Sequence, residues 1–159
     1  MSQVYLLLGG NLGNRFEIFL DAKKQIEKRV GTLLLQSRFY ESEPWGLTHE
    51  NYFLNQVLAV ETSNAPNHVL RTVLSIEKEL GRVRSSGENY SGRTIDIDLL
   101  FYDDLILDQP DLKIPHPLLH KRRFTLKPLV EIAPDFAHPI FSKTVKQLLD
   151  ECEDDIEVY

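Results

Sequence analysis

The sequence predicts an α+β sandwich in which helices cover one face of a mostly antiparallel sheet, with extra elements after it on the C-terminal side. Segments of strand and helix periodicity alternate along the chain, and Gly and Pro residues separate them. Hydrophobic residues make up 42% of the chain and charged residues 26%, as in an ordinary folded domain. A length of 159 residues predicts one domain over residues 1–159.

The first third of the chain predicts a strand, a helix and a second strand. Val4–Leu8 is a continuous apolar run rich in strand formers, and we expect a buried strand that stops at Gly9-Gly10. From Asn14 apolar residues recur at helical spacing, and Gly31 is a typical helix end. Leu33–Tyr40 is predicted as the second strand, with a loop after it.

The middle of the chain repeats the pattern. Tyr52–Glu61 alternates as a third strand, and Asn64-Ala65-Pro66 begins a helix that ends at Gly81. The polar segment Arg82–Arg93 is long enough for a functional loop, and Thr94–Tyr102 is the fourth strand. The order strand-helix-strand-strand-helix-strand is that of the split-βαβ, ferredoxin-like sandwich.

The remainder of the chain is predicted as an addition to this sandwich. Pro115, Pro117 and Pro128 are expected to break up regular structure, and Thr144–Glu151 is a last short helix. Gly and Pro are otherwise scattered, without a linker or an internal repeat.

Composition excludes several classes of function. The 18 Lys and Arg residues against 24 Asp and Glu give a net charge of −6, which argues against a general nucleic-acid binder. The apolar runs are far shorter than the ~20 residues of a membrane span. Cys152 is the single cysteine, so no internal disulfide is possible. The chain opens directly on a strand-like run, and we expect a cytoplasmic protein without a targeting segment.

The most informative stretch runs from Arg93 to Leu100. Side chains alternate across a strand, so Asp96 and Asp98 share one face, with Cα atoms ~6.5 Å apart. Asp is disfavoured in strands, and neighbouring like charges destabilise them. Two carboxylates in this arrangement can hold Mg²⁺ together with waters and substrate phosphates. An isolated pair of this kind would more often be a half-exposed acidic face.

Basic residues accompany the carboxylates. Arg82, Arg84 and Arg93 bracket the loop before the strand, and His120–Phe124 concentrates further cations beside an aromatic ring. Alone, each group would be interpreted as solvated surface charge. Together with the carboxylates they favour phosphoryl transfer, which depends on positioning and charge neutralisation. The chain contains neither the G-x-G-x-x-G nor the G-x-x-x-x-G-K-[ST] nucleotide motif.

Motifs over nearly the whole chain match one family pattern. They are Gly9–Gly13, Ser37–Ser42 with Pro44, Tyr52–Asn55, Gly81–Arg84, Gly92–Leu100, Ile114–Pro117, Arg123-Phe124 and Pro128–Pro134. In these motifs the sequence resembles the 6-hydroxymethyl-7,8-dihydropterin pyrophosphokinases, folate-pathway enzymes that move pyrophosphate from ATP to a pterin alcohol.

The resemblance implies a role for each matched residue. The catalytic positions it implies are Arg82, Arg93, Asp96 and Asp98, and the two aspartates would also hold two Mg²⁺ ions. The implied ATP contacts are Glu77, Arg84, Leu99, His116 and Arg122. The implied pterin contacts are Ser42, Trp45, Phe53, Asn55, Tyr90 and Phe124, with the two phenylalanines stacking on the ring and the asparagine binding its polar edge.

The resemblance also implies a reaction and its partners. The pterin hydroxymethyl oxygen would attack the β-phosphorus of ATP, with AMP as leaving group and Asp96 as the candidate to take the proton. We expect a monomer whose partners are ATP and 6-hydroxymethyl-7,8-dihydropterin, with no nucleic acid and no membrane. Leu74, Asp111, Lys113 and the loop residues Ser85–Gly92 depart from the family pattern, which affects the expected ATP contacts and lid.

Two other classes of function stay open at this point. The first is a different magnesium-dependent phosphoryl or nucleotidyl transferase on a similar sandwich; a simple kinase would release ADP instead of AMP. The second is a non-catalytic ferredoxin-like binding module, in which Asp96 and Asp98 would be surface charges.

Overall fold

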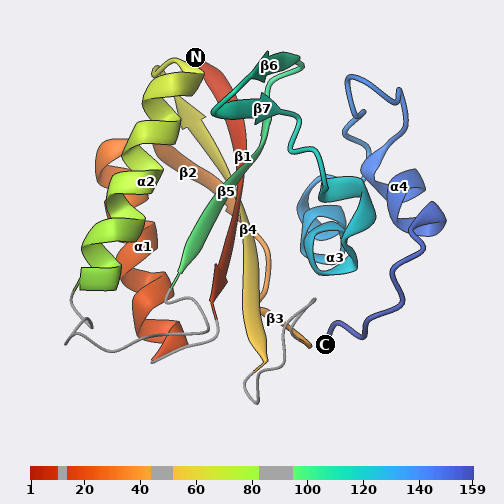
Figure 1. The fold of residues 1–159 in the computed structure, drawn as a ribbon, viewed down its shortest axis with the longest axis horizontal. Helices are drawn as coiled ribbons and strands as arrows, with labels where there is room; N and C mark the ends of the chain where they lie inside the picture. Colours follow the sequence, from red (N-terminus) through yellow and green to blue (C-terminus); the bar gives the residue numbers. More distant parts are fainter. Residues whose placement is uncertain (11–13, 44–51, 83–94) are drawn as a thin grey trace.

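Five strands form one antiparallel sheet in the computed structural model, which describes residues 1–10, 14–43, 52–82 and 95–159 (Figure 1). The strands are β1 (Ser2–Gly10), β2 (Thr32–Gln36), β3 (Tyr40–Ser42), β4 (Phe53–Thr62) and β5 (Asp96–Tyr102). Their order is β2-β4-β1-β5, with β3 also paired to β4, and each of these pairings is antiparallel. This order confirms the predicted split-βαβ arrangement.

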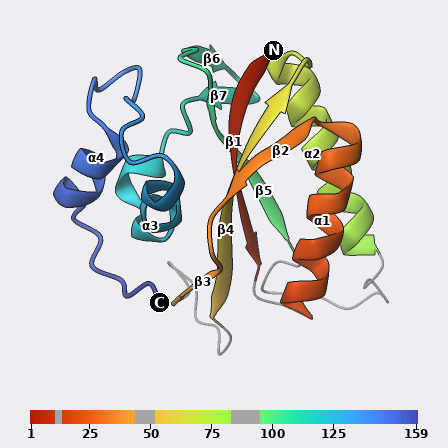
Figure 2. The ribbon, with the colours of Figure 1, turned by 180° about the vertical axis from the view of Figure 1, so that it is seen from behind.

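Helices cover both faces of the sheet (Figures 1 and 2). On one side lie α1 (Arg15–Arg29) and α2 (Pro66–Arg82), as the ferredoxin-like pattern predicts. On the other lie α3 (Arg123–Ile132) and α4 (Val145–Glu151), with the short 3₁₀ helix Leu119–Lys121 before them. The predicted C-terminal addition is therefore a third layer, and β6 (Leu107–Gln109) and β7 (Leu112–Ile114) form a small hairpin between β5 and this layer.

The sheet separates two hydrophobic cores. Leu6 and Leu8 of β1 pack into the core beneath α1 and α2, whereas Tyr5 and Leu7 pack into the core beneath α3 and α4. Successive side chains of a strand point to opposite faces, so a strand buried on both faces must be apolar at nearly every position. This explains why Val4–Leu8 is a continuous apolar run instead of an alternating one.

Three predicted boundaries were wrong. Strand β1 extends beyond the apolar run Val4–Leu8 and includes Gly9 and Gly10, because both glycines pair with β4. The predicted strand Leu33–Tyr40 is two strands, interrupted at Ser37. The Ser37 hydroxyl accepts a hydrogen bond from the Val57 backbone N–H at 3.0 Å, in place of a regular ladder bond.

The third wrong boundary concerns Pro128, which lies inside α3 instead of ending a segment. Proline supplies no backbone N–H, so it weakens a helix interior. Leu126 and Leu129 are fully buried in the core beneath α3, as is Pro128 itself. Their burial compensates for the missing bond.

Candidate active site

A pocket of about 400 Å³ brings together most of the described residues for which a role is predicted. It is lined by the predicted residues Ser42, Phe53, Asn55, Asp96, Asp98, His116, Arg122 and Phe124. These residues come from β3, β4, β5, the segment after β7, and the start of α3. The pocket therefore lies on the α3 side of the sheet.

Asp96 and Asp98 reach the pocket because of the pleat of β5. The alternation predicted from sequence is confirmed: Ile97 is buried on the α1–α2 side, and the two aspartates are half-buried. In the pairing with β1, Asp98 is opposite Leu7 and Asp96 is opposite Gly9. Both partner residues line the same pocket, and Gly9 has no side chain to fill it.

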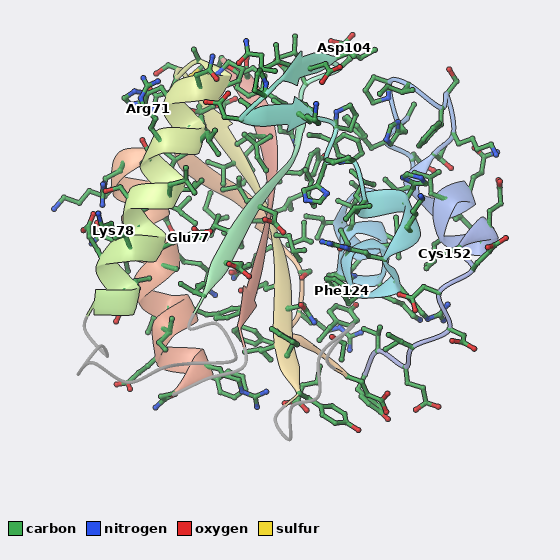
Figure 3. The ribbon with its side chains drawn as sticks, viewed as in Figure 1. Arg71, Glu77, Lys78, Asp104, Phe124 and Cys152 are labelled. Atoms are coloured by element: carbon green, nitrogen blue, oxygen red, sulfur yellow. The ribbon has the colours of Figure 1, made fainter. Side chains whose placement is uncertain are left out.

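Glu77 of α2 holds the strand that carries the aspartates. β5 is an edge strand, and its Ile97 N–H donates a hydrogen bond of 2.6 Å to Glu77 Oε2. Figure 3 shows Glu77 on the sheet side of α2. This bond fixes the backbone between Asp96 and Asp98. Leu99 packs in the core beneath α1 and α2. Neither Glu77 nor Leu99 lines the pocket among the described residues, and their contact with ATP stays a prediction.

His116 lines the same pocket as Asp96 and Asp98, and its imidazole is a neutral hydrogen-bond donor. Its backbone N–H donates to the Leu100 carbonyl of β5 at 3.0 Å, and its Nδ1 accepts from the Leu118 N–H at 3.1 Å. Burial, followed by the charge of Arg122, lowers the pKa of His116 to about 4. A neutral imidazole with an accepting Nδ1 carries its proton on Nε2.

Arg122 connects two ends of the pocket. We call the end with Asp96, Asp98 and His116 the charged end, and the end with Phe53, Phe124 and Asn55 the aromatic end. Burial lowers the pKa of Arg122, while the carboxylates of Asp98 and Asp96 act in the opposite direction. The guanidinium carbon lies 5.5 Å from the centroid of the Phe124 ring, within cation–π range. One arginine thus contacts the aromatic ring and interacts electrostatically with both aspartates.

The opposite end of the pocket combines aromatic surface with a buried amide. Asn55 and Ser42 are 2% and 1% exposed, and Asn55 Nδ2 donates to Ser42 Oγ at 2.9 Å. Phe53 of β4 and Phe124 of α3 line the pocket beside them. Figure 3 labels Phe124 at the start of α3. A planar ring with polar edges fits this chemistry, because an amide offers both donors and an acceptor.

Some of the predicted residues lie outside the described ranges. They are Trp45, Arg84, Tyr90 and Arg93, and the side chain of Arg82 at the end of α2 also belongs to this group. Their roles stay predictions.

Three lining residues had no predicted role. Leu7 and Gly9 follow from the alternation of β1, once this strand is known to extend to Gly10. Glu43, directly after β3, carries no signal in the sequence that separates it from other loop acids.

Within the described ranges, no helix is long and apolar enough to cross a membrane. The same residues contain no cluster of three or more His, Cys, Asp and Glu side chains arranged to hold a metal ion.

Comparison with known proteins gives a consistent match. Residues 5–134 match the family model for 7,8-dihydro-6-hydroxymethylpterin-pyrophosphokinase (HPPK). A 2-amino-4-hydroxy-6-hydroxymethyldihydropteridine pyrophosphokinase of Porphyromonas gingivalis is 43% identical over 141 residues, covering 87% of this chain and 95% of the relative. The enzyme of the same name from Aquifex aeolicus is 40% identical, covering 92% and 90% of the two chains.

Longer proteins contain the same unit. The folic acid synthesis protein FOL1 of Dictyostelium discoideum is 38% identical over 91% of this chain, which spans only 22% of that protein. The wild-type HPPK-DHPS of Plasmodium falciparum with STZ-DHP has a TM-score of 0.75 at 18% identity. That match covers 94% of this chain and 43% of the solved chain, so it supports the fold alone. The family-model match and the close relatives show that the chain belongs to the 7,8-dihydro-6-hydroxymethylpterin-pyrophosphokinase family.

Proposed function

We propose that the pocket binds ATP at its charged end and 6-hydroxymethyl-7,8-dihydropterin at its aromatic end. Family membership gives the chain the pyrophosphokinase step of folate biosynthesis. The observation that supports the assignment of substrates to residues is the composition of the 400 Å³ pocket. Asp96, Asp98, His116 and Arg122 line it together with Phe53, Phe124 and Asn55.

The donor set at the charged end fits magnesium. Mg²⁺ is usually held by one or two carboxylates, with waters and substrate phosphates completing an octahedron. Asp96 and Asp98 on one face of β5 offer two carboxylates, and larger clusters do not occur among the described residues. We propose two Mg²⁺ ions held by this pair. When bound, the ions would neutralise the phosphate charge that develops in the reaction.

The residues of the chain position the two substrates. Phe53 and Phe124 stack on the pterin ring, and Asn55 binds its polar edge in an orientation fixed by Ser42. The hydroxymethyl oxygen is thereby directed at the β-phosphorus of ATP, with AMP as the leaving group. At the other end, His116 donates its Nε2 proton to a phosphate oxygen, and Arg122 adds a positive charge.

The remaining residues with a predicted role complete the proposal. Arg82 and Arg93 steady the transferred group, Glu77, Arg84 and Leu99 contact ATP, and Trp45 and Tyr90 contact the pterin. We propose a monomeric, cytoplasmic protein that binds neither nucleic acid nor membrane, in keeping with its net charge of −6 and its single cysteine.

The test is turnover with ATP, Mg²⁺ and 6-hydroxymethyl-7,8-dihydropterin, with the nucleotide products separated by chromatography. AMP should form in step with the loss of the pterin. ADP as the product would identify a simple kinase and overturn the proposed transfer. ATP binding without any product would show that the site does not perform the reaction.

The first prediction concerns Asp98. Asp98→Asn should lower kcat by at least about 10²-fold, because the neutral amide is a poor ligand for Mg²⁺ in the charged end of the pocket. The measurement is kcat as a function of Mg²⁺ concentration. The control is Asp104→Asn, which changes an exposed aspartate in the turn after β5 (Figure 3). Near-normal turnover of Asp98→Asn would contradict the metal assignment.

A further inference from the structure

Residues 154–159 form an extended segment that joins two walls of the pocket; we call it the 154–159 strap. At one end, Asp154 Oδ2 accepts a hydrogen bond of 3.0 Å from the backbone N–H of Arg123, the first residue of α3. At the other end, the strap pairs with β3. Tyr159 N–H donates to the Glu41 carbonyl at 2.8 Å, and Glu41 N–H donates to the Tyr159 carbonyl at 3.2 Å.

The strap packs against the protein along one of its faces. Figure 1 shows this part of the chain running from α4 past α3 to the end of β3. Residues 154, 156 and 158 are half-buried, and residues 155, 157 and 159 are exposed, as in a strand with one face on the protein. Val158 also forms an antiparallel bridge with Ser42, one of the residues that line the pocket.

Asp154 replaces a cap that α3 lacks. The first backbone N–H groups of a helix have no partner within it, and the residue at the cap position normally supplies an acceptor. In α3 that residue is Arg122, whose side chain makes no capping bond. Asp154 accepts from the first N–H instead, and its other oxygen, Oδ1, accepts from Ile156 N–H at 3.1 Å. A carboxylate at this end of a helix is also favoured by the helix dipole.

The far end of α3 is fastened independently of the strap. Glu131 Oε1 accepts from the Tyr40 hydroxyl at 2.7 Å and from the Arg38 backbone N–H at 3.1 Å. Burial and the bond to Glu131 raise the pKa of Tyr40, which keeps the hydroxyl protonated as a donor. Loss of Asp154 should therefore loosen only the first turn of α3, which contains Phe124, and leave the rest of the helix in place.

We propose that Asp154 is a positioning residue for the pterin end of the pocket. It acts through the first turn of α3, which sets Phe124, while the strap holds β3, which carries Ser42. Both fastened elements contribute to the aromatic end, whereas Asp96, Asp98 and His116 are held by β5 and its neighbours. Arg122 precedes the first turn of α3, and its backbone N–H donates to the Leu119 carbonyl of the 3₁₀ helix at 3.4 Å, a bond that does not depend on Asp154. The inference rests on the proposed assignment of the pterin to this end.

The test compares Asp154→Ala, Asp154→Asn and the control Asp155→Ala in steady-state kinetics with both substrates. Asp155 carries the same charge on the exposed side of the strap. Asp154→Ala should raise KM for the pterin about fivefold, the effect expected of a lost helix cap. Its KM for ATP and its kcat should change by less than about twofold. Asp154→Asn keeps an acceptor for Arg123 and should show a smaller rise, and Asp155→Ala should match the unmodified protein.

The kinetic results can contradict the positioning role of Asp154 in three ways. An equal rise in both KM values, a fall in kcat alone, or the same effect in Asp155→Ala would overturn the positioning role. Circular dichroism establishes that each variant is folded; if Asp154→Ala does not fold, Asp154→Asn decides by the presence or absence of a selective rise in pterin KM. If the unmodified protein itself forms no AMP, the proposed function fails, which is distinct from an active protein whose Asp154 variants are normal.

Discussion

The buried hydrogen bond from Asn55 to Ser42 sets the orientation of the amide that we propose binds the pterin. Ser42→Ala removes the acceptor of Asn55 Nδ2 in a site that is almost closed to water. The amide is then free to turn away from the pterin edge, and we expect KM for the pterin to rise about tenfold. The measurement is steady-state kinetics with each substrate varied in turn.

Ser75→Ala is the matched control for this prediction, since Ser75 lies on α2 away from the pocket and contacts Arg29 and Glu79. It should leave both KM values unchanged. A parallel rise of the ATP and pterin KM values in Ser42→Ala would show that Ser42 supports the whole pocket instead of the pterin end.

Individual residues also show how far the sequence alone reaches. The alternation in β5 predicted that Asp96 and Asp98 share a face, and the structure confirms it. Periodicity could not reveal that Arg122 contacts Phe124 and interacts with both carboxylates, because this depends on how α3 packs against the sheet. The hydrogen bond between Asp154 and the Arg123 N–H could not be predicted either, since the two residues are 31 positions apart in the sequence. Local patterns contain no information on such contacts.

At the scale of elements, the tightest glycine position described is Gly31, which lies between α1 and β2 and packs against β4. A Cβ atom at Gly31 would lie 1.9 Å from the Glu61 carbonyl oxygen and 3.0 Å from Thr62 Cα, so the backbone would have to move. Gly31→Ala should lower the free energy of unfolding by on the order of 3 kcal/mol. Urea denaturation at constant temperature measures the change.

Gly81, near the end of α2, supplies a control of opposite sign. A Cβ atom there would meet nothing within 4 Å, and alanine is the better helix former. Gly81→Ala should therefore raise the free energy of unfolding by about 0.5–1 kcal/mol. If Gly31→Ala and Gly81→Ala lowered the free energy of unfolding by similar amounts, the close contact at Gly31 would not be the cause.

The elements themselves divide into those with and without a local signal. α1, α2, β4 and β5 were predicted because each is long and periodic. β3 is three residues long and exists through its pairing with β4, which no local pattern encodes. The helix around Pro128 was missed because its proline is a strong local breaker, while the burial that overrides it is a tertiary effect.

For the molecule as a whole, acid should weaken the fold through a buried histidine. His138 is 2% exposed, and its Nδ1 accepts hydrogen bonds from the N–H groups of Ile140 and Phe141. Burial, followed by the charge of His120, lowers the pKa of His138 from 6.5 to about 4. Between these pH values the unfolded chain binds a proton that the folded chain does not, so stability falls as the pH drops through the window.

Protonation of His138 should lower the free energy of unfolding by up to about 3 kcal/mol, a loss that is complete by about pH 4 and absent above pH 6.5. The measurement is the free energy of unfolding from pH 7.5 to pH 4. His138→Asn keeps a neutral acceptor for the two N–H groups, and its stability should fall less over this range. His68→Asn, on the exposed side of α2, is the control, and an equal effect of both substitutions would rule out His138 as the cause.

The strand order has a consequence for synthesis on the ribosome. Leu7 of the first strand and Phe124 of α3 line the same pocket, and β1 lies between β4 and β5, which are made much later. β1 must therefore wait for parts of the chain that are made much later before it has a neighbour on either side. A growing chain cannot complete this pocket until Phe124 has left the exit tunnel, so a ligand of the pocket cannot stabilise the chain before that point.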